Sequence, residues 1–148
     1  MKFRVTATAV GAIAAALLAT SPAQAAAKPY DHKDPYKTGC GNSARAVRTG
    51  IMKSRIEPNI GTIKLMWSGT CKTNWIEIKT MTAGYGTINV YTQDGREDRF
   101  SYRAGNGGRH WGNMLYGNDM CAWGSASVSW NGGMGGQSGS GGTPKACK

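Results

Sequence analysis

The alternation of apolar and polar side chains is most regular in the stretch from Ile60 to Ile78. Apolar side chains recur at every second position from Ile63 to Trp67, and the same period returns from Trp75 to Ile78 after a polar break. A period of two with β-branched and aromatic residues is typical of strands. The break is rich in turn-forming residues, so the stretch predicts a hairpin with a long connection that is held by Cys71.

Further stretches carry the same signal and are also predicted to be strands: Ala44 to Thr49, Ile51 to Arg55, Thr87 to Thr92, Glu97 to Arg103 and Ala122 to Trp130. Asp94 and Gly95 form the dipeptide of a two-residue hairpin turn. Six to seven short strands, with turns roughly every eight to twelve residues, predict an all-β fold. We expect a small single-domain barrel or sandwich of antiparallel strands.

The first residues have the composition of a secretory signal peptide. Lys2 and Arg4 precede an apolar run from Val10 to Leu18, which is too short to remain in a bilayer as an anchor. A small-residue cleavage site ends at Ala25, and Ala27 is the second choice. Residues 1–25 are therefore predicted to be removed, and the protein is predicted to be extracellular (secreted).

The last residues are almost pure glycine and serine. We assign residues 26–130 to the all-β domain, which opens with an extended, proline-containing leader up to Thr38, and residues 131–148 to a Gly/Ser-rich tail with a terminal cysteine. Such a tail buries too little surface to fix itself. We expect that it can be deleted at little cost, provided that Cys147 is not paired.

Four cysteines lie after the predicted cleavage site, at Cys40, Cys71, Cys121 and Cys147. An even number in a small exported chain indicates two disulfides that brace the fold. Three pairings are open, and we favour Cys40–Cys71 with Cys121–Cys147 because each closes a loop of moderate length. The sequence has no CxxC and no histidine pair at ligand spacing, so we expect no metal and no cofactor.

The charge changes the range of partners to consider. The chain has 18 lysines and arginines against 8 aspartates and glutamates, a net charge of +10, and removal of Lys2 and Arg4 leaves about +8. This balance favours anionic partners such as wall polymers, lipid headgroups, nucleic acid or acidic proteins. Solubility alone is an equally good explanation.

The aromatic residues supply candidate contacts. We expect Trp67 and Trp75 in the core, because they lie in the disulfide-pinned hairpin. Three other tryptophans stand beside glycines and serines, where a deep core is not expected, and such aromatics next to basic residues suit sugar faces, bases or lipid interfaces. The predicted ligand-binding set is Trp111, Trp123, Trp130, Arg96, Arg103 and Arg109.

No catalytic set stands out. Neither His32 nor His110 lies in a nucleophile motif, and no carboxylates pair as glycosidases require. The alternative is phosphodiester cleavage, with His110 and Glu97 exchanging protons and an arginine holding phosphate.

Three pieces of the chain match a known family. They are Asp34-Pro35-Tyr36-Lys37-Thr38-Gly39-Cys40, then Gly61-Thr62-Ile63-Lys64-Leu65-Met66-Trp67-Ser68 with Cys71 and Asn74-Trp75, and Asn113-Met114-Leu115-Tyr116 with Cys121. From about Asp34 to Val128 the chain resembles the YjfA-like family of secreted Gram-positive bacterial proteins, a domain of unknown function. The resemblance implies a small secreted domain and no known activity. The tail with Cys147 departs from the family pattern, which leaves Cys121 open to another partner.

These features favour a secreted, non-enzymatic binding module that engages an anionic surface such as the cell wall, without stable membrane insertion. Two alternatives stay open: a small ribonuclease-like hydrolase, and an inhibitor or toxin that acts on another protein. The sequence does not indicate an oligomeric state.

Overall fold

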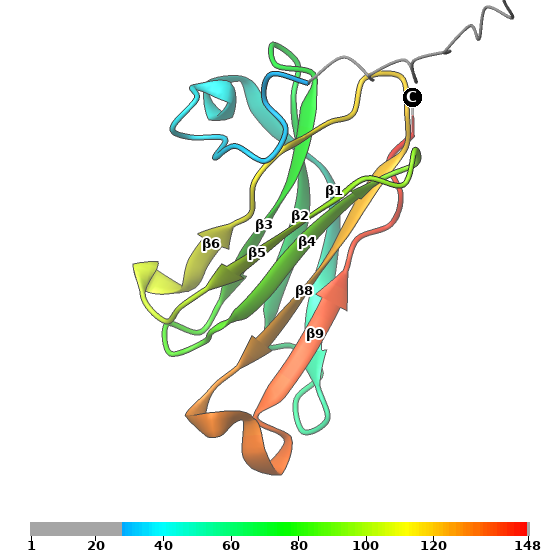
Figure 1. The fold of residues 1–148 in the computed structure, drawn as a ribbon. Coiled ribbons are helices and arrows are strands. Elements are labelled where there is room, and N and C mark those ends of the chain that lie inside the picture. The colour runs from blue at the N-terminus through cyan, green and yellow to red at the C-terminus, as the bar shows by residue number, and fades with distance from the viewer. Residues whose placement is uncertain (1–27, 148) are drawn as a thin grey trace, which may run out of the picture.

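The computed structural model describes residues 28–147, so the predicted signal peptide and its cleavage site lie outside the described residues. The described chain forms strands joined by turns and three short 3-10 helices (Figure 1). In chain order the elements are η1 Cys40–Ser43, β1 Ala44–Ser54, β2 Gly61–Ser68, β3 Thr73–Thr80, β4 Gly86–Thr92, β5 Glu97–Tyr102, η2 Asn106–Gly108, β6 Arg109–Trp111, β7 Leu115–Tyr116, β8 Ala122–Ser129, η3 Asn131–Gly136 and β9 Ser138–Gly142.

The strands form one antiparallel sheet that curls into a nearly closed barrel. Its order is β5-β4-β8-β9-β1-β2-β3-β6, and β7 also pairs with β3. Strands β5 and β6 are therefore the two ends of the sheet. The all-β barrel expected from the sequence is confirmed, with nine strands in the described residues in place of six or seven.

The hairpin predicted from Ile60 to Ile78 forms. Strands β2 and β3 pair from Gly61 opposite Thr80 to Ser68 opposite Thr73. The β4–β5 hairpin also forms, with Gly95 in its turn, and β8 pairs with β4 as a long alternating strand. These are the stretches in which side chains of contrasting polarity alternate, and their prediction is confirmed.

The first strand corrects an expectation. The two strands predicted on either side of Gly50 are one strand, β1, with an irregularity between Ala46 and Arg48. The strand continues through Gly50. A Cβ at this position would collide with the Gly142 carbonyl of β9, so only glycine fits here. The glycine therefore permits a close approach of two backbones.

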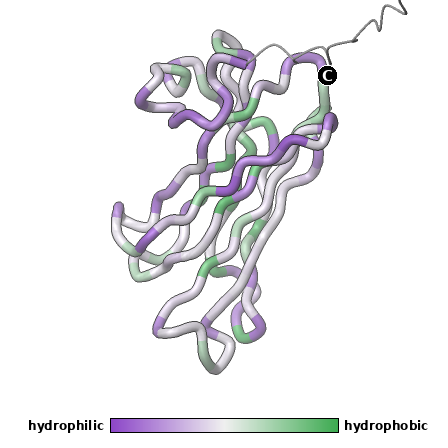
Figure 2. Tube along the Cα trace, in the orientation of Figure 1, coloured by the Kyte–Doolittle hydropathy of each residue, from purple (hydrophilic) through white to green (hydrophobic). Residues whose placement is uncertain are grey.

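The prediction for the Gly/Ser-rich tail is also corrected. Residues 138–142 form β9, which pairs with β8 over five residues and with the end of β1, so the all-β domain does not end at 130. Backbone hydrogen bonds hold this strand, and Figure 2 shows it pale beside the hydrophobic positions of its neighbours. The disulfides are Cys40–Cys71 and Cys121–Cys147, the two favoured pairings, so the condition for a dispensable tail is not met.

Two hydrophobic clusters fill the fold. The larger lies inside the barrel, where isoleucine, leucine and valine side chains from β2, β3, β4 and β8 are buried. The smaller lies on the other face of β3, where Trp75 is fully buried with Cys40 and Met114. Trp67 is buried as well, so both tryptophans of the central hairpin are core residues as expected.

Two disulfides in so small a chain indicate an oxidising location outside the cytoplasm. The described residues contain no helix with the length and apolar character needed to cross a bilayer.

Gly139→Ala tests the place of β9. A Cβ at this position would collide with the Lys53 carbonyl and with the Ile60 side chain, so we expect a loss of about 1–3 kcal/mol in the free energy of unfolding. Ser140→Ala is the matched control, because Ser140 is exposed on the same strand, and it should change stability by about 0.5 kcal/mol or less. Urea unfolding measures both. Equal stabilities of the two variants would contradict this position of the strand.

Candidate functional site

Strands β5 and β6 share no ladder, and we call the strip between them the seam. Residues 28–39, which we call the leader, pair with the segment after β6: the His32 N–H donates to the Met114 carbonyl (2.8 Å) and the Met114 N–H to the Lys33 carbonyl (2.9 Å). The barrel is therefore closed here by side chains and turns, because β5 and β6 are not hydrogen-bonded to each other.

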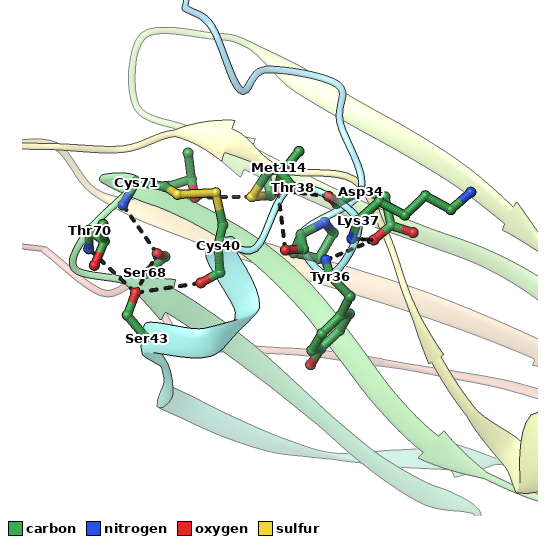
Figure 3. Close-up of a disulfide and its surroundings, with 12 residues drawn as sticks. Asp34, Tyr36, Lys37, Thr38, Cys40, Ser43, Ser68, Thr70, Cys71 and Met114 are labelled. Atoms are coloured by element: carbon green, nitrogen blue, oxygen red, sulfur yellow. Dashed lines mark hydrogen bonds between the residues drawn. A yellow bond between two sulfur atoms is a disulfide. The ribbon is translucent and has the colours of Figure 1, made fainter.

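The leader is a series of hydrogen-bonded turns and not the extended segment that its prolines suggested. Asp34 Oδ1 accepts the backbone N–H groups of Tyr36 (2.8 Å) and Lys37 (3.0 Å). The Cys40–Cys71 disulfide then ties the end of this turn to the β2–β3 connection (Figure 3). The segment thus covers Trp75 on the outer face of β3.

A groove of about 270 Å³ opens along the seam, and we call it the seam groove. Its walls come from the leader, β5, η2 and β6. Its lining residues are Asp34, Phe100, Ser101, Tyr102, Arg103, Asn106, His110 and Trp111. The volume lies just below the range of small-molecule sites, so the groove suits a single sugar- or phosphate-sized group.

Tyr102 and His110 form the floor of the groove. Their rings stack with centroids 4.4 Å apart, and the Tyr102 hydroxyl donates to the Ser127 carbonyl (2.8 Å). Burial lowers the pKa of His110 and raises the pKa of Tyr102, because both charged forms lose hydration. His110 Nε2 is buried and has no hydrogen-bond partner among the described residues. The floor is therefore neutral and aromatic near pH 7.

Asp34 and Trp111 form one wall. The Trp111 Nε1–H donates to Asp34 Oδ2 (3.2 Å). Burial alone would raise the pKa of Asp34, but the hydrogen bonds from Lys37, Trp111 and Tyr36 outweigh burial and hold it below its usual value. The wall thus carries a fixed negative charge.

Arg109 is held beside this wall by Glu77 and Tyr36. Its guanidinium donates to both Glu77 oxygens (2.8 and 2.9 Å) and to the Tyr36 hydroxyl (2.7 Å), and lies over the Trp111 ring. Burial and the hydrogen bond to Glu77 raise the pKa of Tyr36 to about 12. Burial alone would raise the pKa of Glu77, but the bonds from Arg109 and Tyr36 lower it. Arg109 is thus neutralised by its partners.

Arg103 differs from Arg109. It lines the groove and is exposed, and it makes no hydrogen bond or ion pair with the described residues. Its guanidinium is free to bind a phosphate or carboxylate bidentately. The groove therefore has an aromatic floor, a fixed acid on one wall and a free cation.

A second pair lies farther along the seam. His32 Nδ1 is 2.6 Å from Asp98 Oδ2, and Asn113 Nδ2 reaches the same oxygen at 3.5 Å. The Asp98 side chain is only 7% exposed, and its Oδ1 has no hydrogen-bond partner among the described residues. The His32 side chain is 61% exposed and its backbone has a φ of 62°. A buried carboxylate thus orients an exposed imidazole.

Half of the predicted ligand-binding set gathers at this site. Arg103 and Trp111 line the groove, and Arg109 packs on Trp111. Arg96 instead joins the leader to the β4–β5 hairpin through Asp31 (2.5 Å) and Asp94 (2.8 Å).

The other two tryptophans lie elsewhere. Trp123 is on the outer face of β8, stacked on Tyr91 with Lys145 over its ring. Trp130 belongs to the interior cluster, which corrects the expectation that it lies outside a deep core. The prediction took the neighbouring glycines as a sign that Trp130 is exposed to solvent. These glycines instead form η3 and β9.

The proposed pair of His110 and Glu97 is not assembled. His110 stacks on Tyr102, whereas Glu97 is at the other end of β5, paired with Tyr91. Five residues of strand separate Glu97 from Tyr102, or about 17 Å. The seam pairs a different histidine and carboxylate, His32 and Asp98.

A second hollow, of about 150 Å³, lies near the Cys121–Cys147 disulfide and was not anticipated. Arg45 and Arg48 line it with Trp67 and Met120. Arg48 donates to the Lys145 carbonyl (3.0 Å), whereas Arg45 has no hydrogen bond or ion pair with the described residues. Side chains three positions apart face opposite sides of a regular strand, so the sequence carried no signal for this hollow, and the irregularity in β1 between the two arginines brings them together.

Within residues 28–147, no three histidine, cysteine, aspartate or glutamate side chains gather as a metal site would require. The seam groove offers no glycine-rich phosphate cradle of the kind that nucleotide cofactors use. Its chemistry is that of aromatic, amide and charged side chains.

Comparison with known proteins fixes the family. The family model described as protein of unknown function (DUF2690) matches residues 28–125. The chain belongs to this family. It is also similar to the uncharacterized protein YjfA of Bacillus subtilis (strain 168), with 33% identity over 92 residues, which are 59% of this chain and 59% of that protein. The chain thus spans 59% of the length of this curated relative, and the resemblance seen in the sequence is confirmed. No solved structure matches the chain.

The DUF2690 match includes the leader, the hairpin of β2 and β3, and the whole seam. It ends at residue 125, within β8, so that η3 and β9 lie beyond the matched range. The seam groove is therefore built from residues that the family model covers.

His110→Gln tests the buried imidazole. Burial lowers the pKa of His110, so the unfolded chain binds a proton at this imidazole more readily than the folded chain does. The contribution of neutral His110 to stability is therefore complete above the unfolded pKa of about 6.5 and is lost as the pH falls below that value. Thermal unfolding between pH 7 and pH 5 should therefore show a shallower loss of stability in the variant than in the natural protein. Identical slopes would show that His110 is not the group responsible.

Proposed function

We propose that the protein is a secreted, non-enzymatic binding module that engages an anionic surface, with the anionic polymers of a bacterial cell wall as its first partner. The observation that carries the proposal is how the charges are paired. The four close charge-pair contacts of the described residues use Asp31, Asp94, Glu77 and Asp98, and their partners are Arg96, Arg109 and His32. Two arginines and one histidine thus occupy half of the 8 carboxylates, and most basic side chains keep no acidic partner within residues 28–147.

The seam groove supports a sugar-containing polymer as the ligand. Phe100 and Trp111 line the groove with aromatic surface, which suits the apolar faces of sugars. Ser101 and Asn106 offer neutral hydrogen-bonding groups, and Arg103 offers an unpaired cation. A polymer that alternates sugars with phosphates or carboxylates presents groups that are complementary to these side chains.

Secretion is part of the proposal. The signal-peptide features of residues 1–25 support it, and so do the two disulfides. Export would bring the protein into contact with wall polymers.

Binding to purified walls tests the proposal. We expect the protein to sediment with walls that retain their anionic polymers and not with walls stripped of them, and binding should weaken as salt rises. Arg103→Gln should weaken binding about five- to tenfold. Arg99→Gln, on β5 four residues earlier and outside the groove, is the matched control for the loss of one charge.

Each other result has a clear meaning. Equal effects of the two variants would contradict the groove as the contact and leave diffuse attraction. No binding at low salt would contradict the function. Salt-indifferent binding to a single protein would favour the inhibitor or toxin reading.

A hydrolase is the second candidate, and the His32–Asp98 pair favours it. Asp98 holds Nδ1 of His32, which leaves Nε2 at the surface as general bases require. In RNA cleavage, Nε2 would take the proton of the 2′-hydroxyl, and the 2′ oxygen would bond to phosphorus to give a 2′,3′-cyclic phosphate as the phosphorus–O5′ bond breaks. The leaving O5′ would take a proton from water, and the resulting hydroxide would take the proton from Nε2. RNA turnover should then disappear in His32→Ala, fall in Asp98→Asn and persist in His110→Gln. Absence of turnover in the natural protein would exclude this candidate.

A further inference from the structure

Two loops lie side by side at the end of the barrel away from the Cys40–Cys71 disulfide (Figure 1). One joins β1 to β2 and carries Ile56, and the other is η3, which joins β8 to β9 and carries Met134. They touch closely enough that a Cβ on Gly136 would lie 2.9 Å from Ile56 Cγ2. We call the pair the apolar tips.

The tips carry the two most exposed large hydrophobic side chains among the described residues. Met134 is 78% exposed and Ile56 is 52% exposed. A third exposed side chain, Tyr85, lies nearby, because Tyr85 forms a bridge with Ser129 at the start of the η3 loop. Neither Ile56 nor Met134 belongs to a hydrophobic cluster of the fold. The fold therefore does not account for these side chains.

Both loops have a fixed conformation. Ser54 Oγ accepts the N–H groups of Ile56 (3.3 Å) and Glu57 (2.9 Å), and the Ser54 N–H donates to the Glu57 carbonyl (2.8 Å). In η3 the Gly133 N–H donates to the Trp130 carbonyl (2.8 Å) and the Gln137 N–H donates to the Met134 carbonyl (3.0 Å). The two apolar side chains are thus held outward in advance, which reduces the entropy lost on binding.

The charges beside the tips are mainly positive. Lys53 and Arg55 precede Ile56, and Glu57, which follows it, is the one acidic residue in this loop. The Arg55 guanidinium also lies against Gly136 of the other loop. None of the four close ion pairs of residues 28–147 involves these three residues. An apolar tip with a basic rim is complementary to a bilayer whose headgroups are anionic.

We propose that the apolar tips dock the protein reversibly on an anionic lipid bilayer. Ile56 and Met134 enter the headgroup–acyl boundary, and Lys53 and Arg55 meet the lipid phosphates. Two or three side chains are too few for a stable protein interface, which needs about 800 Å² from each partner, whereas a bilayer accepts single apolar side chains. The tips are separate from the seam groove, so this inference does not depend on the proposed wall-binding function.

Vesicle co-sedimentation of the oxidised protein tests this inference. We expect binding to phosphatidylcholine vesicles that contain phosphatidylglycerol and much weaker binding to phosphatidylcholine alone. The double variant I56S/M134S should bind at least about tenfold more weakly, and Arg55→Gln about fivefold more weakly. The matched controls are Ile51→Ser, which removes a 45% exposed isoleucine from the middle of β1, and Arg99→Gln on β5; both should bind as the natural protein does.

The outcomes are separable. Because the substituted side chains are exposed, unchanged thermal unfolding is expected and shows that each variant is folded. Failure of the natural protein to bind anionic vesicles at low salt would overturn the inference, and so would equal binding by the tip variants and their controls. Loss of wall binding but not vesicle binding in the tip variants would assign the tips to another partner and would also overturn it.

Discussion

The interior volume of the barrel is the constraint on which the rest of the structure depends. Large side chains from β2, β3 and β4, such as Leu65 and Ile76, fill the interior. Little space remains for β8 and β9, and a Cβ on Gly124 would collide with Ile76. Glycine and alanine on the inner face of these strands let the sheet curl until it almost closes. The glycine-rich end of the chain is therefore a requirement of the packing.

The incomplete closure explains the position of the candidate site. Strand β6 has only three residues, and a ladder between β5 and β6 is absent from the described chain. An open sheet edge must be covered or charged. The leader covers one part of it through the His32–Asp98 pair, and the part that the leader does not cover is the seam groove. The same feature that leaves the sheet open supplies a hollow with aromatic walls.

The sequence predicted those elements in which side chains of contrasting polarity alternate: the β2–β3 hairpin, the β4–β5 hairpin and β8. It could not predict β9, because glycine and serine give no contrast, nor β6 and β7, which are too short to show a period. The leader's turns depend on partners far along the chain, such as Arg96 for Asp31, 65 positions away. For the site, residue type indicated Arg103 and Trp111, but only the barrel's closure could bring them together with Asp34.

The attachment of the leader also accounts for the charge that the surface presents. Asp31, Asp98 and Glu77 each bind a basic side chain at the leader or at its contacts, because polar contacts and short turns fix a segment that has few apolar residues. These carboxylates cannot neutralise basic residues elsewhere. Strands β1 and β2 contain arginine or lysine but no acidic residue. The composition sets the excess of positive charge, and the fold decides where it is exposed, because it places these carboxylates at the leader and away from strands β1 and β2.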